Sequence, residues 1–161
     1  MNHALGRSRG GFSCKIHFVC DNGGIPLGAV LSGGQRNDSV FFEDTLKSVS
    51  IPQRRGRPKN RPMMVTADKG YDSDKIRGYL RSRGIKSNIP IRKLRKGAKR
   101  RKRGRKPNFS AVIYRDRNIV ERLIGWLKQA RRIATRYEKT AENYLAMIKV
   151  AFIRFYVCKC L

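Results

Sequence analysis

The stretch FSCKIHFVC, residues 12–20, determines the fold class, because its side chains alternate between two faces of an extended strand. One predicted face carries Cys14, Ile16, Phe18 and Cys20, and the other carries Lys15, His17 and Val19. The turn sequence DNGG follows at residues 21–24, and residues 27–31 predict a second strand. The two strands are therefore expected to form an antiparallel hairpin.

Outward from the hairpin, the next two elements are a helix and a strand. Asp38 or Ser39 is placed to cap a helix that begins near Val40. Residues 63–67, MMVTA, are a continuous apolar run, which is typical of a buried central strand.

In the rest of the chain a further helix and strand are followed by two long helical patterns. A helix capped by Asp72 or Ser73 and ended by Gly84 is followed by a short strand at residues 85–90. Helical patterns then extend from 110 to 135 and from 140 onward. This order predicts an α/β protein with one domain over residues 1–161.

The charge of the chain indicates a polyanionic partner. The 161 residues include 38 Lys and Arg against 11 Asp and Glu, which gives a net charge of +27. Nucleic acid is the expected partner, since such a surface repels itself until phosphates neutralise it. Residues 92–109 are interpreted as a basic, flexible insertion that orders on a polyanion; a solvated insertion without specific contacts is the alternative.

We expect neither a secretory leader nor a membrane span. The start, MNHALGRSRGG, has no apolar stretch, and Lys149, Arg154 and Lys159 interrupt the apolar C-terminal segment. We therefore expect a soluble, cytoplasmic protein that associates with the bacterial nucleoid.

The cysteines and histidines do not predict a metal site. Cys14 and Cys20 lie about 20 Å apart on one extended strand, and Cys158 and Cys160 point to different helix faces. Free thiols are favoured over zinc. His17 is expected at the surface or near DNA.

Two acidic residues are candidates for catalysis. Asp68 follows the apolar run, at the strand end where ligands bind in open α/β sheets. On a helix drawn at about 100° per residue, Tyr114, Arg117, Glu121 and Lys128 share one stripe within about 60°. A solvated helix face with an ion pair between Arg117 and Glu121 is the alternative interpretation.

A resemblance to a known family is carried by GRSRGGFSCKIHFVCDNGGIPL, LSGGQRNDS, TADKGYDSD and YRDRNIVERLIGWLKQARRIATRYEKTAENY. These stretches resemble the catalytic core of bacterial insertion-sequence DDE transposases of groups four and five. The most specific element is the pattern Y-x-x-R-x-x-x-E-x(6)-K. It is matched by Tyr114, Arg117, Glu121 and Lys128.

The resemblance implies a ribonuclease H-like fold, with helices packed on a mixed sheet, and an enzyme that cleaves and transfers DNA strands. Three carboxylates would hold two Mg²⁺ or Mn²⁺ ions, with Asp68 as the second aspartate and Glu121 as the glutamate. Transposon ends and target DNA would be the partners of a homo-oligomer. The residues that would contact DNA are Tyr114, Arg117, Lys128, Arg131 and Arg132.

The chain also departs from the family pattern. The family's first aspartate lies on a first strand upstream of GRSRGG, so the domain is expected to be partial, truncated at the N-terminus with that strand missing. Two origins fit: the downstream product of a frameshifted gene, with an upstream-frame product as partner, or a decayed fragment. We expect weak or no activity from the isolated chain. The rival function is a non-catalytic basic nucleic-acid-binding protein.

Overall fold

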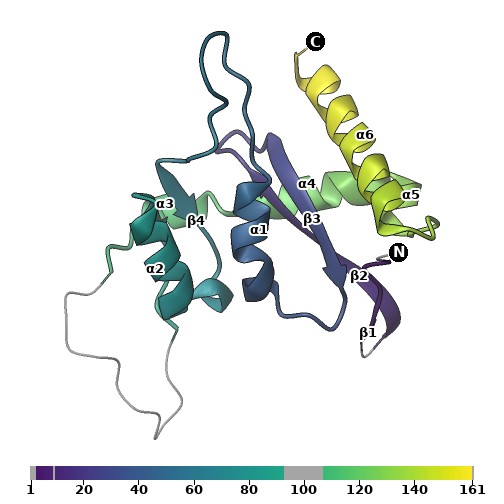
Figure 1. The fold of residues 1–161 in the computed structure, drawn as a ribbon, viewed down its shortest axis with the longest axis horizontal. Helices are drawn as coiled ribbons and strands as arrows, with labels where there is room; N and C mark the ends of the chain where they lie inside the picture. The colour runs from purple at the N-terminus through teal and green to yellow at the C-terminus, as the bar shows by residue number, and fades with distance from the viewer. Residues whose placement is uncertain (1–2, 9, 93–106, 161) are drawn as a thin grey trace, which may run out of the picture. The chain divides into compact units, whose positions relative to one another are not determined.

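The computed structural model describes residues 3–8, 10–92 and 107–160 (Figure 1). It divides into two compact units, the first comprising residues 1–60 and 118–161 and the second residues 61–117. Most of the basic insertion predicted at 92–109 lies outside the described residues. The helices and strands confirm the α/β class.

The first unit is built on the predicted hairpin. Strands β1 (Gly6–Ser8), β2 (Gly11–Cys20) and β3 (Pro26–Gly33) form an antiparallel sheet in that order. The turn between β2 and β3 is held by Asp21 Oδ1, which accepts hydrogen bonds of 2.8 Å from the backbone N–H groups of Gly23 and Ile25. The hairpin prediction is confirmed, because its alternation and turn are both local features.

One face of the hairpin packs on the helices α4 (Asn118–Gln129), α5 (Arg131–Ala134) and α6 (Ala141–Cys160). Their shared core consists of Leu123, Leu127, Ile133, Tyr144, Ile148, Ala151, Phe152 and Phe155. The strand face that was predicted from alternation packs against it, with Cys14, Ile16, Phe18 and Cys20 all in contact. Trp126 meets Phe155 edge to face at 4.7 Å, as expected of a packing residue.

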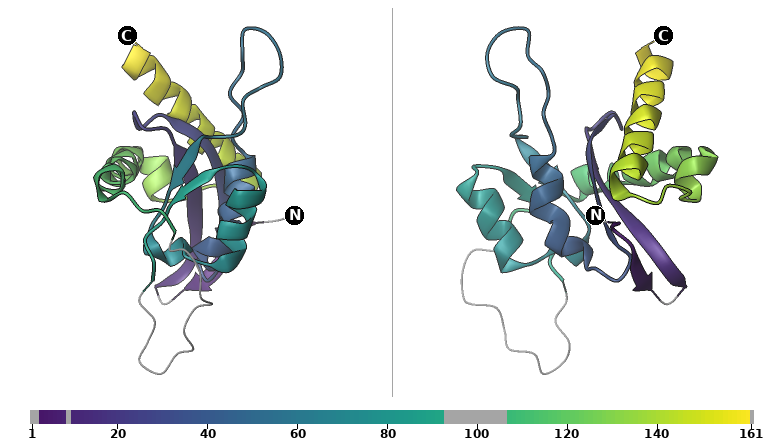
Figure 2. Two further views of the ribbon diagram at one scale, coloured as in Figure 1. Left: turned by 90° about the vertical axis from the view of Figure 1, so that its left-hand side faces the viewer. Right: turned by 45° about the vertical axis from the view of Figure 1, so that its right-hand side comes forward.

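The other face of the hairpin is covered by helix α1 (Phe42–Lys47) and the short 3-10 helix η1 (Asp38–Phe41), as Figure 2 shows for α1. The cap of η1 is Asn37, whose side chain accepts from Ser39 N at 3.0 Å, so the prediction of Asp38 or Ser39 was wrong. Asp38 instead pairs with Lys15 at 2.9 Å.

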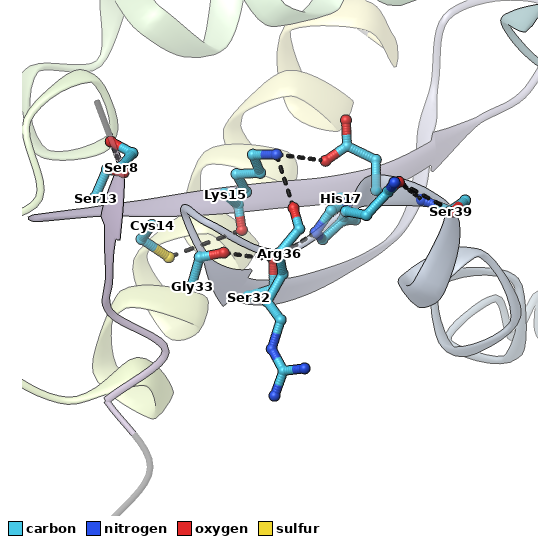
Figure 3. Close-up of polar contacts among 11 residues, drawn as sticks. Ser8, Ser13, Cys14, Lys15, His17, Ser32, Gly33, Arg36 and Ser39 are labelled. Atoms are coloured by element: carbon cyan, nitrogen blue, oxygen red, sulfur yellow. Dashed lines mark hydrogen bonds and ion pairs between the residues drawn. The ribbon is translucent and has the colours of Figure 1, made fainter. Parts of the chain in front are cut away.

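The position of His17 corrects a second prediction. Its Nε2 lies 2.7 Å from Ser32 Oγ (Figure 3). The residue is 8% exposed, and its ring stacks on Phe41 with centroids 5.0 Å apart. His17 is therefore a buried packing residue and not a surface one. Alternation within β2 could not show this, because the cover comes from a later segment of the chain.

The burial of His17 predicts a loss of stability in mild acid. Burial lowers its pKa from the ordinary value of 6.5, with the Asp38 charge opposing and Lys15 adding to this effect. His17 therefore binds a proton more readily in the unfolded chain than in the folded chain. The free energy of unfolding falls as pH drops below about 6.5. Thermal unfolding of His17→Gln should depend less on pH than that of the wild type between about pH 7.5 and 5. Equal slopes would contradict the prediction.

The second unit, residues 61–117, contains a parallel pair of strands, β4 (Met64–Thr66) and β5 (Lys86–Asn88). Helix α2 (Asp74–Ser82) connects them, capped by Ser73, whose Oγ accepts from Ile76 N at 3.2 Å. The end of α2 at Gly84, with φ +64°, agrees with the prediction.

The core of this second unit is small, and its strands are not deeply buried. Its buried apolar residues are Ile76, Leu80, Ile85 and Ile89. The 63–67 run was expected to be a buried central strand, but Met63 is 84% exposed and Met64 37%. Within the described chain β4 pairs only with β5, which leaves this strand at an edge.

The helix predicted over residues 110–135 is interrupted twice. Helix α3 (Ala111–Arg115) ends in a turn where Arg117 N–H donates to the Tyr114 carbonyl at 3.1 Å. Ala130 then separates α4 from α5. No glycine or proline marks either interruption in the sequence, and the prediction of one continuous helix was wrong. Among the residues described, no helix is long and apolar enough to cross a membrane.

Candidate active site

Asp68 lies two residues after the end of β4 and is the N-cap of the short 3-10 helix η2 (Lys69–Tyr71). Its Oδ1 accepts from the backbone N–H of Lys69 at 2.7 Å and from the hydroxyl of Tyr114 at 3.1 Å. Its Oδ2 accepts no hydrogen bond from the part of the chain that the structure describes. The exposed carboxylate is thus oriented through one oxygen, and the other is open to a ligand.

Tyr114 and Arg117 complete this cluster within the second unit. Partial burial and the neighbouring Asp68 carboxylate raise the pKa of Tyr114, while Arg117 opposes the rise. The Arg117 guanidinium carbon lies 5.6 Å from the centroid of the Tyr114 ring. The phenol therefore stays protonated at neutral pH and donates to Asp68, with a cation beside it.

Glu121 and Lys128 lie on helix α4 in the first unit. Both side chains are exposed, and their seven-residue spacing places them on one helix face, away from the buried Leu123 and Leu127. A carboxylate and an ammonium group therefore share the solvent face of α4.

Arg131 and Arg132, both exposed, extend this positive charge onto α5. Arg132 Nε lies 3.1 Å from Oε1 of the buried Glu138, so one of its nitrogens is held while the side chain stays 62% exposed. Ile133, which follows, is buried and fixes α5 against the core.

Arg136 was missed by the sequence reasoning. A cavity of about 590 Å³ lies in the first unit, lined by β2 and by residues that include Lys128, Arg136 and Tyr144. Arg136 stacks over Tyr144 at 5.1 Å, and its Nη1 is buried without a hydrogen-bond partner in the described chain. It is a further cation that lines the same cavity as Lys128. In a segment this rich in arginine, nothing in the sequence distinguishes it from its neighbours.

The free cysteines include Cys14, Cys20 and Cys158. Burial, aided by the Asp21 charge, raises the pKa of Cys20 to about 11, and burial also raises that of Cys14. Both groups therefore remain neutral thiols at physiological pH, which are poor metal ligands.

The predicted site residues thus fall into two groups. Asp68, Tyr114 and Arg117 come together in the second unit, and Glu121 and Lys128 share a helix face in the first. The meeting of Asp68 and Glu121 at one metal site remains a prediction. Oxygen donors of this kind suit Mg²⁺ or Mn²⁺. Neither unit gathers three His, Cys, Asp or Glu side chains in a metal-binding cluster among its described residues.

Comparisons with known proteins agree with the family suggested by the sequence. The family profile of the transposase DDE domain matches residues 2–156. A Burkholderia cepacia protein named as a transposase for insertion sequence element IS402 is 35% identical over 137 residues, which cover 84% of this chain and 59% of that relative. A Brucella ovis protein named as a transposase for element IS6501 is 26% identical over 137 residues, covering 85% and 92%.

This chain therefore spans less than two thirds of the first relative and most of the second. No solved structure gives a significant match.

Proposed function

The chain belongs to the transposase DDE domain family, and on this premise we propose that it is the catalytic region of a DNA transposase that binds transposon DNA and cleaves and transfers its strands. The observation that carries the proposal is the hydrogen bond of 3.1 Å from Tyr114 to Asp68. It joins two residues, 46 positions apart, that the family resemblance had named separately as a DNA contact and a metal ligand.

The proposed fold is ribonuclease H-like. It is supported by an antiparallel sheet of three strands, a parallel pair, and helices that cover both faces of the β2–β3 hairpin. The proposed domain is a partial one that another segment completes.

Asp68 and Glu121 would hold the divalent metal ions, Mg²⁺ or Mn²⁺, together with a third carboxylate. When bound, such ions activate the attacking oxygen and stabilise the leaving oxygen at phosphorus. Tyr114 fixes the Asp68 carboxylate so that Oδ2 is available as a ligand.

The proposed phosphate contacts are the cations of both groups: Arg117, Lys128, Arg131 and Arg132. Tyr114, beside Arg117, would add a neutral contact. Together these residues would position the DNA backbone.

The proposed partners are double-stranded transposon-end and target DNA, and further copies of the chain assembled on that DNA. We also propose that an upstream-frame product supplies the first aspartate on a β-strand. In support, residues 14–20 of β2 pair on one edge with β3, and no described strand occupies their other edge. An open strand edge can accept a strand from another segment. A nucleoid-associated location in the cytoplasm fits these partners.

A non-catalytic DNA-binding role is the second candidate. It is favoured by the lack of a three-carboxylate cluster within the described part of either unit. The two candidates differ in whether Asp68 and Glu121 are needed for function.

The purified chain should bind duplex end DNA but cleave it weakly or not at all. The net charge of +27 favours binding, whereas a site without its third carboxylate should hold metal poorly. Labelled end DNA incubated with the chain and Mg²⁺ or Mn²⁺ checks both points. Robust cleavage would overturn the expectation, and failure to bind DNA would contradict the proposed function.

A further inference from the structure

The segment between α1 and β4 forms a closed loop in the first unit. Ile51 and Lys59 are joined by two backbone hydrogen bonds, Ile51 N to Lys59 O at 2.9 Å and Lys59 N to Ile51 O at 2.8 Å. Residues 52–58 between them are all exposed. Figure 1 shows this segment as a narrow loop that projects past the end of α1. The closed base gives the loop a defined shape without a packed core.

The loop presents cations without acidic neighbours. Its charged side chains are Arg54, Arg55, Arg57 and Lys59, all exposed. No Asp or Glu occurs between Asp44 and Asp68. None of these four side chains forms an ion pair or hydrogen bond with the described residues. The repulsion among these four cations is therefore not offset by ion pairs with the described residues. A bound polyanion would neutralise them.

The order of residues at the tip of the loop gives it a particular shape in addition to its positive charge. Gly56 has φ +88°, a left-handed conformation, and an added Cβ would meet nothing within 4 Å. Arg55 and Arg57 flank this glycine, and Pro58, which lacks an N–H group, follows Arg57. The tip is therefore a thin ribbon whose backbone can approach a surface closely at Gly56, with a guanidinium on each side.

This shape matches the minor groove of A·T-rich DNA. That groove is narrow, and its negative potential is enhanced over A·T tracts, which attracts inserted arginines. Arginine is also more weakly hydrated than lysine, so it loses less when it leaves water. A broad element such as a helix suits the major groove, which is about 12 Å wide, whereas a thin ribbon suits the minor groove of about 6 Å.

We propose that residues 54–58 form a second DNA contact, which inserts Arg55 and Arg57 into the minor groove of A·T-rich duplex DNA with Gly56 against the groove. The proposal rests on the proposed function only in taking duplex DNA as the ligand. It adds a sequence preference that neither Asp68 nor Glu121 supplies.

The test measures binding of the full chain to two duplexes of equal length, one with a central A·T tract and one with a G·C tract. A chelator is present, so that strand cleavage plays no part. We expect the wild type to bind the A·T duplex about tenfold more tightly. The double variant Arg55→Lys/Arg57→Lys keeps both charges and should bind the two duplexes within about twofold of each other, because lysine resists desolvation in a narrow groove.

A control for general loss of positive charge removes two cations elsewhere in the same unit. Lys149 and Arg154 are exposed on α6, and Lys149→Ala/Arg154→Ala should at most weaken binding to both duplexes alike, with the A·T preference kept. Equal wild-type affinities, a G·C preference, or a preference that survives in the lysine variant would each overturn the inference and leave the proposed function standing. Failure to bind either duplex would overturn both.

Discussion

Asp68→Asn is expected to lower transposition by at least about 100-fold when the chain acts together with the proposed upstream-frame product in cells. Asparagine has the same shape, and its Oδ1 can still accept from Lys69 N and from Tyr114, so the local fold should persist. The substitution removes the negative charge that a divalent cation needs. The measurement is the frequency at which a marked element with intact ends moves.

A matched control for Asp68→Asn is Asp74→Asn. Asp74 is an exposed acid in the first turn of α2, in the same unit, and has no proposed role in catalysis. This variant should transpose at close to the wild-type frequency. Glu121→Gln should resemble Asp68→Asn. If Asp68→Asn moves the element as often as the control, the chain does not use this carboxylate and the non-catalytic role gains support.

Ile148→Ala is expected to cost about 3 kcal/mol of unfolding free energy. Ile148 is fully buried in the core shared by α4, α5 and α6, so the substitution leaves a cavity among tightly packed side chains. For a chain of this length the melting temperature should fall by about 10 °C. Thermal unfolding followed by circular dichroism measures the change.

The control for this change lies on the same helix. Ile153 is 59% exposed on α6, and Ile153→Ala makes the same chemical change without opening a core cavity. Its effect should stay within about 0.5 kcal/mol. Equal losses from both variants would mean that α6 does not pack as the structure shows.

The parts of the fold that could be predicted are those specified by neighbouring residues. The β2–β3 hairpin follows from an alternating strand and a turn built by Asp21, and α2 follows from its cap at Ser73 and its end at Gly84. His17 shows the limit. The strand pattern places it opposite the core, but a later segment, with Phe41, covers that face.

The interruptions near Arg117 and at Ala130 show a related limit. No helix-breaking residue marks them. The start of α3 depends on a partner distant in sequence, because Asn88 Oδ1 accepts from the backbone N–H of Ser110, the cap of this helix, at 2.8 Å. A one-dimensional helical pattern carries no information about such partners.

The candidate site also has features that could be predicted from the sequence and features that could not. The motif named Asp68 and Tyr114 separately, and their hydrogen bond could not be derived from spacing, because it depends on how α3 packs near the end of β4. The shared face of Glu121 and Lys128 was predictable, since both lie on one helix. The proposed sharing of a metal site by Asp68 and Glu121 joins residues of two units, and no local pattern specifies such a relation.

The most direct test of that joint site is cleavage of the polypeptide by Fe²⁺, a divalent ion that accepts carboxylate ligands, in place of Mg²⁺. With ascorbate and peroxide, bound iron generates radicals that cut the backbone close to its ligands, and mass spectrometry locates the cuts. We predict cuts near both Asp68 and Glu121 when the wild-type chain is combined with the proposed upstream-frame product, which restores the third carboxylate; the cuts should be suppressed by excess Mg²⁺ and lost at both positions in Asp68→Asn. Cuts near only one of the two residues, or unchanged cutting near Glu121 in Asp68→Asn, would contradict a shared metal site.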